Sequence, residues 1–352
     1  MEINKSFWKN KTVFLTGHTG FKGGWLTLML SNLGARVHGY SLDQNLQPNL
    51  FEVLNLQEFL SSSTIADIRD LERLNQELNN IQPEIIFHMA AQPLVLQSYQ
   101  SPIDTISTNV QGTVNVLEAA RLCGSVKAIV NVTTDKCYAN DDRNTPFKES
   151  DKLGGNDIYS ASKACSELIS LAYNKSFLEQ RGVYIATARA GNVIGGGDWS
   201  PNRLLPDVLR ALDSKSLLEI RNPSAIRPWQ HVLEPLYGYI KLSQALIEQG
   251  KMFSSAWNFG PDINGCKSVE WIINKISQSI PETRWKVVAN EKSYEANVLK
   301  INSEKAKSHL NWVPKWDLET AISKTLKWHQ FYNSDENMAE FTLRQINKYL
   351  DD

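Results

Sequence analysis

The chain has 352 residues, 42% of them hydrophobic, and its 37 basic residues almost balance its 38 acidic residues, which leaves a net charge of −1. This composition excludes a disordered chain, and the length suits one large α/β unit or two domains. Nucleic acids and anionic membranes attract proteins with a basic surface, which the overall charge does not indicate. We therefore expect a soluble, cytoplasmic protein with neither kind of partner.

Membrane, secretion and metal signals are also missing from the sequence. No segment has the ~18 to 20 apolar residues that span a bilayer, and the opening "MEINKSFWKN" contains no apolar core of a signal peptide. The four cysteines form no C-x-x-C pair, and the six histidines do not occur at metal-ligand spacing. We expect free thiols and no metal site.

The first half of the chain alternates short apolar runs with amphipathic segments. Strands are predicted over residues 11–17, 35–42, 84–91, 127–134 and 183–191. Helices are predicted over residues 23–34 and 109–124, each of which ends at a glycine. Strands that alternate with helices imply βαβ crossovers, and hence a parallel sheet with helices on both faces. The predicted fold class is α/β, with a Rossmann-like doubly wound sheet.

The pattern changes after residue 191, where glycine, proline and tryptophan mark a loop-rich region. Helices are predicted there over residues 268–280 and 318–332, among isolated strands. We expect a cofactor domain over residues 1–190 and a smaller mixed α/β substrate domain over 191–352. A segment around 228–260 is a candidate for return to the first domain, and the site should lie in the crevice between the two.

The glycine-rich turn "TGHTGFKGGW" follows the first strand and opens the first helix. Glycines allow a tight turn and a close approach to a pyrophosphate, and the helix N-terminus offers free N–H groups. The G-x-x-G-x-x-G spacing is typical of short-chain dehydrogenase/reductases. Lys22 either reaches a phosphate or lies on the surface. The predicted cofactor contacts in this turn are Gly17, His18, Gly20, Phe21, Lys22 and Gly23.

Two further residues bear on the cofactor. Asp43 follows the second strand, where a carboxylate accepts hydrogen bonds from a ribose, and no arginine or lysine follows it directly to bind a 2′-phosphate. NAD is therefore favoured over NADP. His88 lies inside an apolar run, and we expect it to be a hydrogen-bonded core residue rather than a catalytic one.

A tyrosine and a lysine lie one helical turn apart in "YSASK". The cation of Lys163, together with a positive nicotinamide ring, would favour the phenolate of Tyr159. Tyr159 would then act as the base that accepts a proton from a substrate hydroxyl. Tyr237 and Lys241 share the spacing, but small residues follow Tyr159 and bulky ones surround Tyr237, so the first pair is preferred.

Several long strings together carry a family resemblance: "GHTGFKGGWL", "HMAAQ", "TTDKCY", "YSASKACSE", "GGGDWSPNRLLPD" and "IRPWQHVLEPL". With these strings the chain resembles, over nearly its whole length, the extended short-chain dehydrogenase/reductases that act on nucleotide sugars. Within them it is most similar to the CDP-glucose 4,6-dehydratases. The resemblance implies oxidation of the sugar at C4 by NAD, loss of water across C5 and C6, and reduction at C6. It also implies a place in the synthesis of a deoxysugar of a bacterial lipopolysaccharide O-antigen.

The resemblance assigns roles to the stretch that ends the predicted strand 127–134. Thr134 would hydrogen-bond the C4 oxygen, and Asp135 would protonate the leaving C6 hydroxyl. Relatives that act on dTDP-glucose carry glutamate at the position of Lys136. Lys136 is therefore either the C5 base or a cation that stabilises an enolate, and Tyr159 and Lys163 carry out the oxidation.

The remaining site predictions also follow from the resemblance. The further cofactor contacts would be Asp67, Ala90, Ala91 and Thr133. Asn192 and Arg227 would hold the substrate diphosphate. Trp199 or Trp229 either lines the base pocket or packs in the core. Asn202 stands where an aspartate is expected. The full set of predicted substrate contacts is Gln92, Asn192, Trp199, Arg203, Arg227 and His231. A homodimer or a dimer of dimers, formed through helices that include the one with Tyr159, is also implied.

Two other functions remain open. A nucleotide-sugar 4-epimerase would use the same fold, the same Tyr–Lys pair and NAD, but would need no groups for elimination. A non-catalytic dinucleotide-sensing protein would usually lack Tyr159 or Lys163, and both are present.

Overall fold

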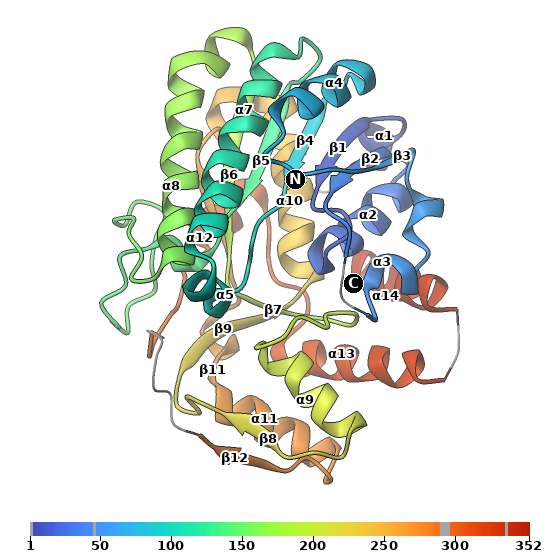
Figure 1. Cartoon of the computed structure of the whole chain (residues 1–352), viewed down its shortest axis with the longest axis vertical. Coiled ribbons are helices and arrows are strands. Elements are labelled where there is room, and N and C mark those ends of the chain that lie inside the picture. The colour runs from blue at the N-terminus through green and yellow to red at the C-terminus, as the bar shows by residue number, and fades with distance from the viewer. Residues whose placement is uncertain (1–2, 45–46, 289–295, 335–336) are drawn as a thin grey trace.

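Seven parallel strands form the main sheet of the computed structural model, which describes residues 3–44, 47–288, 296–334 and 337–352 (Figure 1). The strand order is β10-β6-β5-β4-β1-β2-β3, which is that of a doubly wound sheet. The strands are β1 (Thr12–Thr16), β2 (Arg36–Ser41), β3 (Ser62–Ile65), β4 (Ile85–His88), β5 (Ala128–Val132), β6 (Tyr184–Ala190) and β10 (Ala256–Phe259).

Helices cover both faces of the main sheet because its strands are apolar on both sides. Val13 and Leu15 of β1 pack with Trp25 on one face, and Phe14 packs with Leu78 on the other. The first face is covered by α2 (Phe21–Asn32) and α10 (Leu233–Gln249). The second face is covered by α4 (Leu71–Ile81), α7 (Gly112–Leu122) and α8 (Ile158–Tyr173).

A smaller region lies below the carboxyl ends of these strands in Figure 1. It contains a three-stranded sheet, β11-β9-β7, and a two-stranded sheet, β12-β8. Buried isoleucine and leucine side chains join these strands to three helices in a separate core. The elements are β7 (Asn192–Ile194), β8 (Leu218–Ile220), β9 (Ile226–His231), β11 (Cys266–Ser268), β12 (Trp285–Val287), α9 (Leu204–Asp213), α11 (Val269–Ser279) and α13 (Leu318–Tyr332).

Further helical segments complete the described chain. The other α-helices are α1 (Lys5–Trp8), α3 (Leu50–Val53), α5 (Val95–Gln100), α6 (Pro102–Ile106), α12 (Glu304–Leu310) and α14 (Met338–Asp351). The 3₁₀ turns are Leu56–Phe59, Asp135–Cys137, Glu179–Arg181, Gly250–Phe253 and Ile263–Gly265. The π-helical segments are Ser107–Gln111 and Asn174–Leu178.

The predicted fold class is confirmed, and each predicted strand and helix is present within a few residues of its expected bounds. The strands β3 and β10 are additional. The predicted domain boundary, residue 190, is the last residue of β6. The strand β10 pairs with β6, so part of the chain after residue 228 returns to the main sheet. The assignment of a cofactor domain and a substrate domain stays a prediction. In the described part of the chain, no helix has both the length and the apolar character needed to cross a membrane.

Candidate active site

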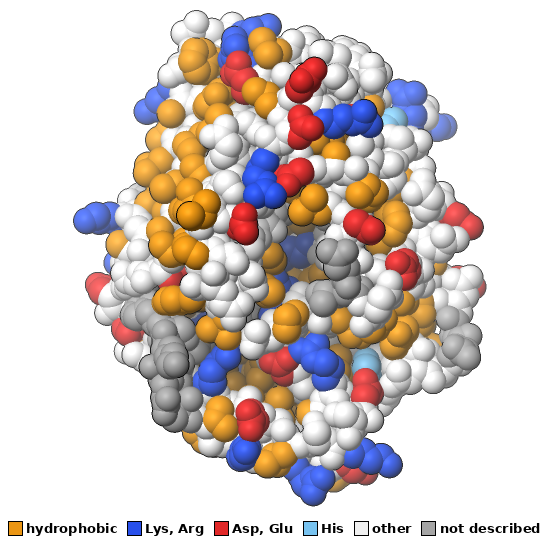
Figure 2. Space-filling model, in the orientation of Figure 1, with side chains coloured by type: hydrophobic (Ala, Val, Ile, Leu, Met, Phe, Trp, Pro, Cys, Tyr) orange, Lys and Arg blue, Asp and Glu red, His pale blue; other side chains and the backbone are white. Residues whose placement is uncertain are grey.

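A cavity of about 1000 Å³ lies where the carboxyl ends of the main-sheet strands meet the smaller region. Figure 2 shows a hollow near the middle of this face, with lysine and arginine side chains inside it. One end of the cavity is lined by residues 40–44, at the end of β2 and directly after it, and the other by residues 216–222 around β8. The glycine-rich turn and the ends of β5 and β6 lie between them, as expected for a ligand site in an open α/β sheet.

The glycine-rich turn is packed so tightly that a side chain is excluded at two of its glycines, Gly17 and Gly23. Gly17 has φ +78°, and a Cβ there would lie 2.8 Å from the amide nitrogen of Ala90. A Cβ on Gly23 would lie 2.0 Å from the carbonyl oxygen of Gly17. The first turn of α2 has no side-chain cap, so its N–H groups are available to an anion. This turn therefore fits the pyrophosphate of a dinucleotide.

The predicted cofactor contacts divide into two groups. His18 is fully buried, donates to or accepts from Ser63 at 2.7 Å, and packs on Phe51. The carboxylate of Asp67 is held by Arg69 at 2.6 Å. The structure thus places neither side chain at the cavity wall, and their contact with a cofactor stays a prediction. The predicted contacts that line the cavity are Gly17, Gly20, Phe21, Lys22, Gly23, Asp43, Ala90, Ala91, Thr133, Tyr159 and Lys163.

The stretch after β5 forms a 3₁₀ turn, Asp135–Cys137, at the cavity wall. Thr134 caps the turn by accepting the amide of Lys136 at 3.3 Å, and its hydroxyl donates to Oδ1 of Asp135 at 3.2 Å. Asp135 is only 1% exposed, and among the described residues its Oδ2 has no hydrogen-bond partner. An acid and a base therefore lie at the carboxyl end of a central strand.

Tyr159 and Lys163 project from the first turns of α8 into the same cavity. The helix begins at Asp157, whose side chain accepts the amide of Ser160 at 2.9 Å. Burial raises the pKa of Tyr159 to about 12, although a hydrogen bond with Thr134 and nearby Arg203 act in the opposite direction. Burial lowers the pKa of Lys163 to about 8.

The amine of Lys163 bonds to the backbone of the neighbouring strand. Nζ of Lys163 donates to the carbonyl oxygen of Val132, the last residue of β5, at 3.0 Å. Lys163 therefore joins the helix to the strand that leads into the Asp135 turn. The five predicted catalytic residues line a single cavity: Thr134, Asp135, Lys136, Tyr159 and Lys163.

Lys22 lies in the charged centre of the cavity rather than on the surface. Burial is the main cause that lowers its pKa to about 7. The charge of Arg203 lowers the pKa further, and the charge of Asp135 raises it. Arg203 is itself held by Asp198 at 2.9 Å. Asp198, which the sequence analysis did not single out, lines the cavity and belongs to the quoted string "GGGDWSPNRLLPD", five residues before the arginine.

The predicted substrate contacts also divide. Asn192, Arg203 and Arg227 line the cavity, as does Asn202. The side chain of Gln92 instead bonds to Leu94 and Thr105, that of Trp199 packs against Trp328 and Tyr332, and that of His231 is fully buried between Trp25 and Trp316. Gln92, Trp199 and His231 do not line the cavity, and their contact with the substrate stays a prediction.

Two other predictions concern residues outside the site. His88 is buried with Thr16 at 2.9 Å and Thr113 at 3.1 Å, so the expected core role is confirmed. Lys241 donates to the carbonyl oxygen of Asn311 and does not line the cavity. The four cysteines are free thiols, and the described residues contain no cluster that could hold a metal ion.

Comparisons with known proteins agree with this geometry. A family model described as GDP-mannose 4,6 dehydratase matches residues 14–325. The chain is 47% identical to the CDP-glucose 4,6-dehydratase of Salmonella typhimurium, over 99% of this chain and 98% of the relative. The solved dTDP-glucose 4,6-dehydratase of Bacillus anthracis, in complex with NAD, shares the fold with a TM-score of 0.76 and 23% identity, over 94% of this chain and 99% of the other. An epimerase of Methanothermobacter thermautotrophicus shares it with a TM-score of 0.81 and 20% identity, over 97% and 96%.

Proposed function

The chain belongs to the GDP-mannose 4,6-dehydratase family, and on this premise we propose that it converts CDP-glucose to CDP-4-dehydro-6-deoxyglucose and water. The relative at 47% identity bears the name CDP-glucose 4,6-dehydratase. One observation carries the proposal: Asp135 and Lys136 line the same cavity as Tyr159 and Lys163. Oxidation at C4 needs the second pair, and loss of water needs an acid and a group that handles the C5 proton.

The cavity fits NAD at its end near β2. The bare turn of α2 would bind the pyrophosphate, and Asp43 would accept hydrogen bonds from the ribose. When NAD is bound, it supplies the oxidant for C4 and then the reductant for C6, and it ends the cycle unchanged. The lack of an arginine or lysine directly after Asp43 supports NAD over NADP.

The oxidation uses the tyrosine and the lysine of α8. Tyr159 takes the proton of the C4 hydroxyl, while the hydroxyl of Thr134 bonds to the C4 oxygen. Lys163 stabilises the phenolate through its positive charge, which its bond to Val132 keeps at the base of the cavity. The C4 alcohol becomes a ketone, which acidifies the proton on C5.

The elimination uses the turn after β5. The C5 proton leaves, the C6–O bond breaks, and Asp135 gives its proton to the departing oxygen, which leaves as water. Lys136 either takes the C5 proton as a neutral amine or stabilises the enolate as a cation. A proton returned to C5 completes the 6-deoxy product, and the sum of the steps is the loss of one water molecule.

The opposite end of the cavity would hold the nucleotide. Amide and guanidinium groups match phosphate oxygens, so Asn192, Arg203 and Arg227 are the proposed contacts of the diphosphate. The preference for cytidine rests on the relative at 47% identity.

An exposed apolar surface supports self-association. Large hydrophobic side chains on α6 and α8 face outward, with Ile103 82%, Leu168 55% and Leu171 49% exposed. Figure 2 shows hydrophobic side chains gathered along the left edge, where α7 and α8 lie in Figure 1. An exposed apolar surface of this kind favours an interface. We therefore propose a homodimer that forms through α6 and α8, and two such dimers could associate into a dimer of dimers. We place it in the cytoplasm, in the synthesis of an O-antigen deoxysugar.

The test is the product formed by the purified protein with NAD and CDP-glucose. Mass analysis should find a 4-keto-6-deoxy sugar lighter by one water. A C4-inverted hexose of unchanged mass would instead support an epimerase, and binding of NAD without turnover would support a sensing protein. Parallel incubations with dTDP-, UDP- and GDP-hexoses measure the preference for the base.

A further inference from the structure

A buried ion pair lies directly behind the catalytic cavity. Arg189 of β6 and Glu167 of α8 form two parallel hydrogen bonds, Nη2 to Oε2 at 2.8 Å and Nε to Oε1 at 2.9 Å. Their side chains are 3% and 4% exposed, and no other ion pair among the described residues has both partners so buried. Burying two charges is costly, so such a pair is weak evidence for stability and needs another explanation.

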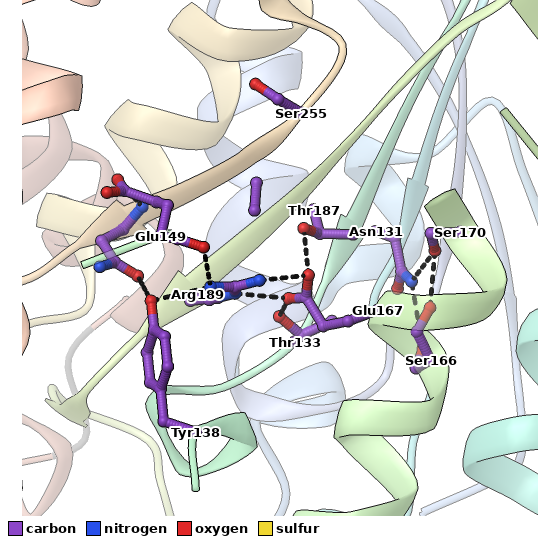
Figure 3. Close-up of polar contacts among 12 residues, drawn as sticks. Asn131, Thr133, Tyr138, Glu149, Ser166, Glu167, Ser170, Thr187, Arg189 and Ser255 are labelled. Carbon is purple, nitrogen blue, oxygen red and sulfur yellow. Dashed lines mark hydrogen bonds and ion pairs between the residues drawn. The ribbon is translucent and has the colours of Figure 1, made fainter. Parts of the chain in front are cut away.

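Both carboxylate oxygens of Glu167 accept two hydrogen bonds each, as Figure 3 shows. The hydroxyl of Thr133 donates to Oε1 and that of Thr187 donates to Oε2, each at 2.5 Å. Arg189 uses its remaining nitrogen to donate to the hydroxyl of Tyr138 at 2.8 Å and to the carbonyl oxygen of Glu149 at 3.3 Å. The pair is therefore the centre of a fully bonded network.

These bonds end on both sides of the catalytic turn. Thr133 immediately precedes Thr134, and Tyr138 immediately follows the turn Asp135–Cys137. The ion pair thus fixes the residue that enters the turn and the residue that leaves it. Within the turn, by contrast, Asp135 has one described hydrogen bond, from Thr134, and its Oδ2 has no described partner.

The same pair fixes the helix that carries the second catalytic group. Tyr159, Lys163 and Glu167 follow one another at four-residue spacing, so they lie on one face of α8. Lys163 bonds to Val132, the residue before Thr133, and the charge of Glu167 opposes the effect of burial on the pKa of Lys163.

We propose that the Glu167–Arg189 pair holds the oxidising residues of α8 and the eliminating residues of the turn in register, so that Glu167 and Arg189 are positioning residues of the dehydration. The proposal rests on the proposed function. Two groups from distant stretches must act on one hexose in sequence, and a displacement of about 1 Å can cost about 100-fold in rate. A buried ion pair with fixed geometry is suited to this task because it has few alternative arrangements.

The test removes single hydroxyl groups of the network without removing a charge. Tyr138→Phe removes the bond from Arg189 at the exit of the turn, together with the bond of the same hydroxyl to Asn258. Thr133→Val removes the bond at the entry of the turn. Thr187→Val is the matched control, because it removes an equal 2.5 Å bond to Glu167 that comes from β6 and not from the turn. Thr133→Ser keeps the hydroxyl and serves as the rescue. All are made in the full chain, and NAD affinity and melting temperature are measured for each.

The readout is rapid mixing of the NAD-loaded protein with CDP-glucose. Tyr138→Phe and Thr133→Val should form NADH at nearly the wild-type rate but release the 4-keto-6-deoxy product about 10 to 100 times more slowly, so NADH should accumulate. Thr187→Val should stay within about twofold of the wild type, and Thr133→Ser should recover most of the rate.

Two results would overturn the proposal. The first is a product rate that follows only the melting temperature, with Thr187→Val as slow as the turn variants and no accumulation of NADH. The second is wild-type behaviour of both turn variants. A wild-type protein that makes no product from CDP-glucose would instead remove the proposed function, and the positioning role with it.

Discussion

A methyl group at Gly23 should disturb the protein itself, whereas one at Gly20 should disturb only the binding of NAD. A Cβ on Gly23 would lie 2.0 Å from the carbonyl oxygen of Gly17, and 2.8 Å from its carbonyl carbon. Ordinary contact begins near 3.4 Å, so the start of α2 would have to move by roughly 1.4 Å against backbone. Overpacking of this kind costs about 1–3 kcal/mol. Since 1 kcal/mol lowers the melting temperature of a large domain by roughly 2 °C, the Gly23→Ala variant should melt about 2–6 °C lower.

Gly20→Ala is the matched comparison within the same turn. Its Cβ would meet only the carbonyl oxygen of Gly17, at 3.4 Å, so the cofactor-free protein should melt within about 2 °C of the wild type. The methyl would nevertheless stand at the start of α2, where a pyrophosphate must approach, and should weaken NAD binding by about tenfold or more. Thermal unfolding of NAD-free protein and a fluorescence titration with NAD measure the two effects. Equal melting shifts in both variants, or wild-type NAD affinity in Gly20→Ala, would refute this reasoning.

Four further predictions address the chemistry and the assembly. Tyr159→Phe should form no NADH when CDP-glucose is added, and a normal NADH signal would exclude the tyrosine as the base. Asp135→Asn should still form NADH but lose about 10² to 10⁴-fold in product formation; an unchanged rate would contradict its role as the acid. The kcat/KM should fall as pH rises through about 8, because burial lowers the pKa of Lys163 to about 8 and only the cation stabilises the phenolate. The Lys163→Arg variant stays charged, so it should be slower but should not show this fall in kcat/KM. If the fall is still seen in that variant, it belongs to another group. Leu168→Glu should convert the dimer to a monomer in light scattering, and an intact dimer would place the interface elsewhere.

The sheet could be predicted from sequence because it is buried on both faces. Runs such as residues 11–17 and 127–134 have apolar residues at consecutive positions in their middle, a pattern typical of a strand covered by helices on both sides. The strand β3 was not predicted, because it lacks this apolar pattern. Ser62, Ser63 and Thr64 pair only with β2 at the edge of the sheet, so their composition is polar and resembles a loop.

The five residues predicted as catalytic line one cavity because strand ends and helix spacing place the backbone reliably. The direction of a side chain in an irregular segment depends instead on distant residues. His18 turns inward because the absence of a side chain on Gly39 makes room for its ring, and His231 turns inward between Trp25 and Trp316. Nothing within either motif indicates these contacts. Glu167 was overlooked for a related reason. On a helix it resembles a surface carboxylate, and its partner Arg189 lies on β6, 22 residues further along the chain.

The fold alone does not decide between a dehydratase and an epimerase, because solved structures of both kinds match it with TM-scores of 0.76 and 0.81. Both reactions would begin with oxidation of an alcohol by the Tyr–Lys pair, so that pair does not decide either. They diverge once the ketone has formed, when an epimerase reduces C4 again and a dehydratase must first expel water. That second path needs a proton donor held against solvent, and Asp135 lies 1% exposed on a turn fixed at both ends. We therefore expect the path taken after oxidation to depend on this turn of three residues, and on the buried ion pair that we propose as its support.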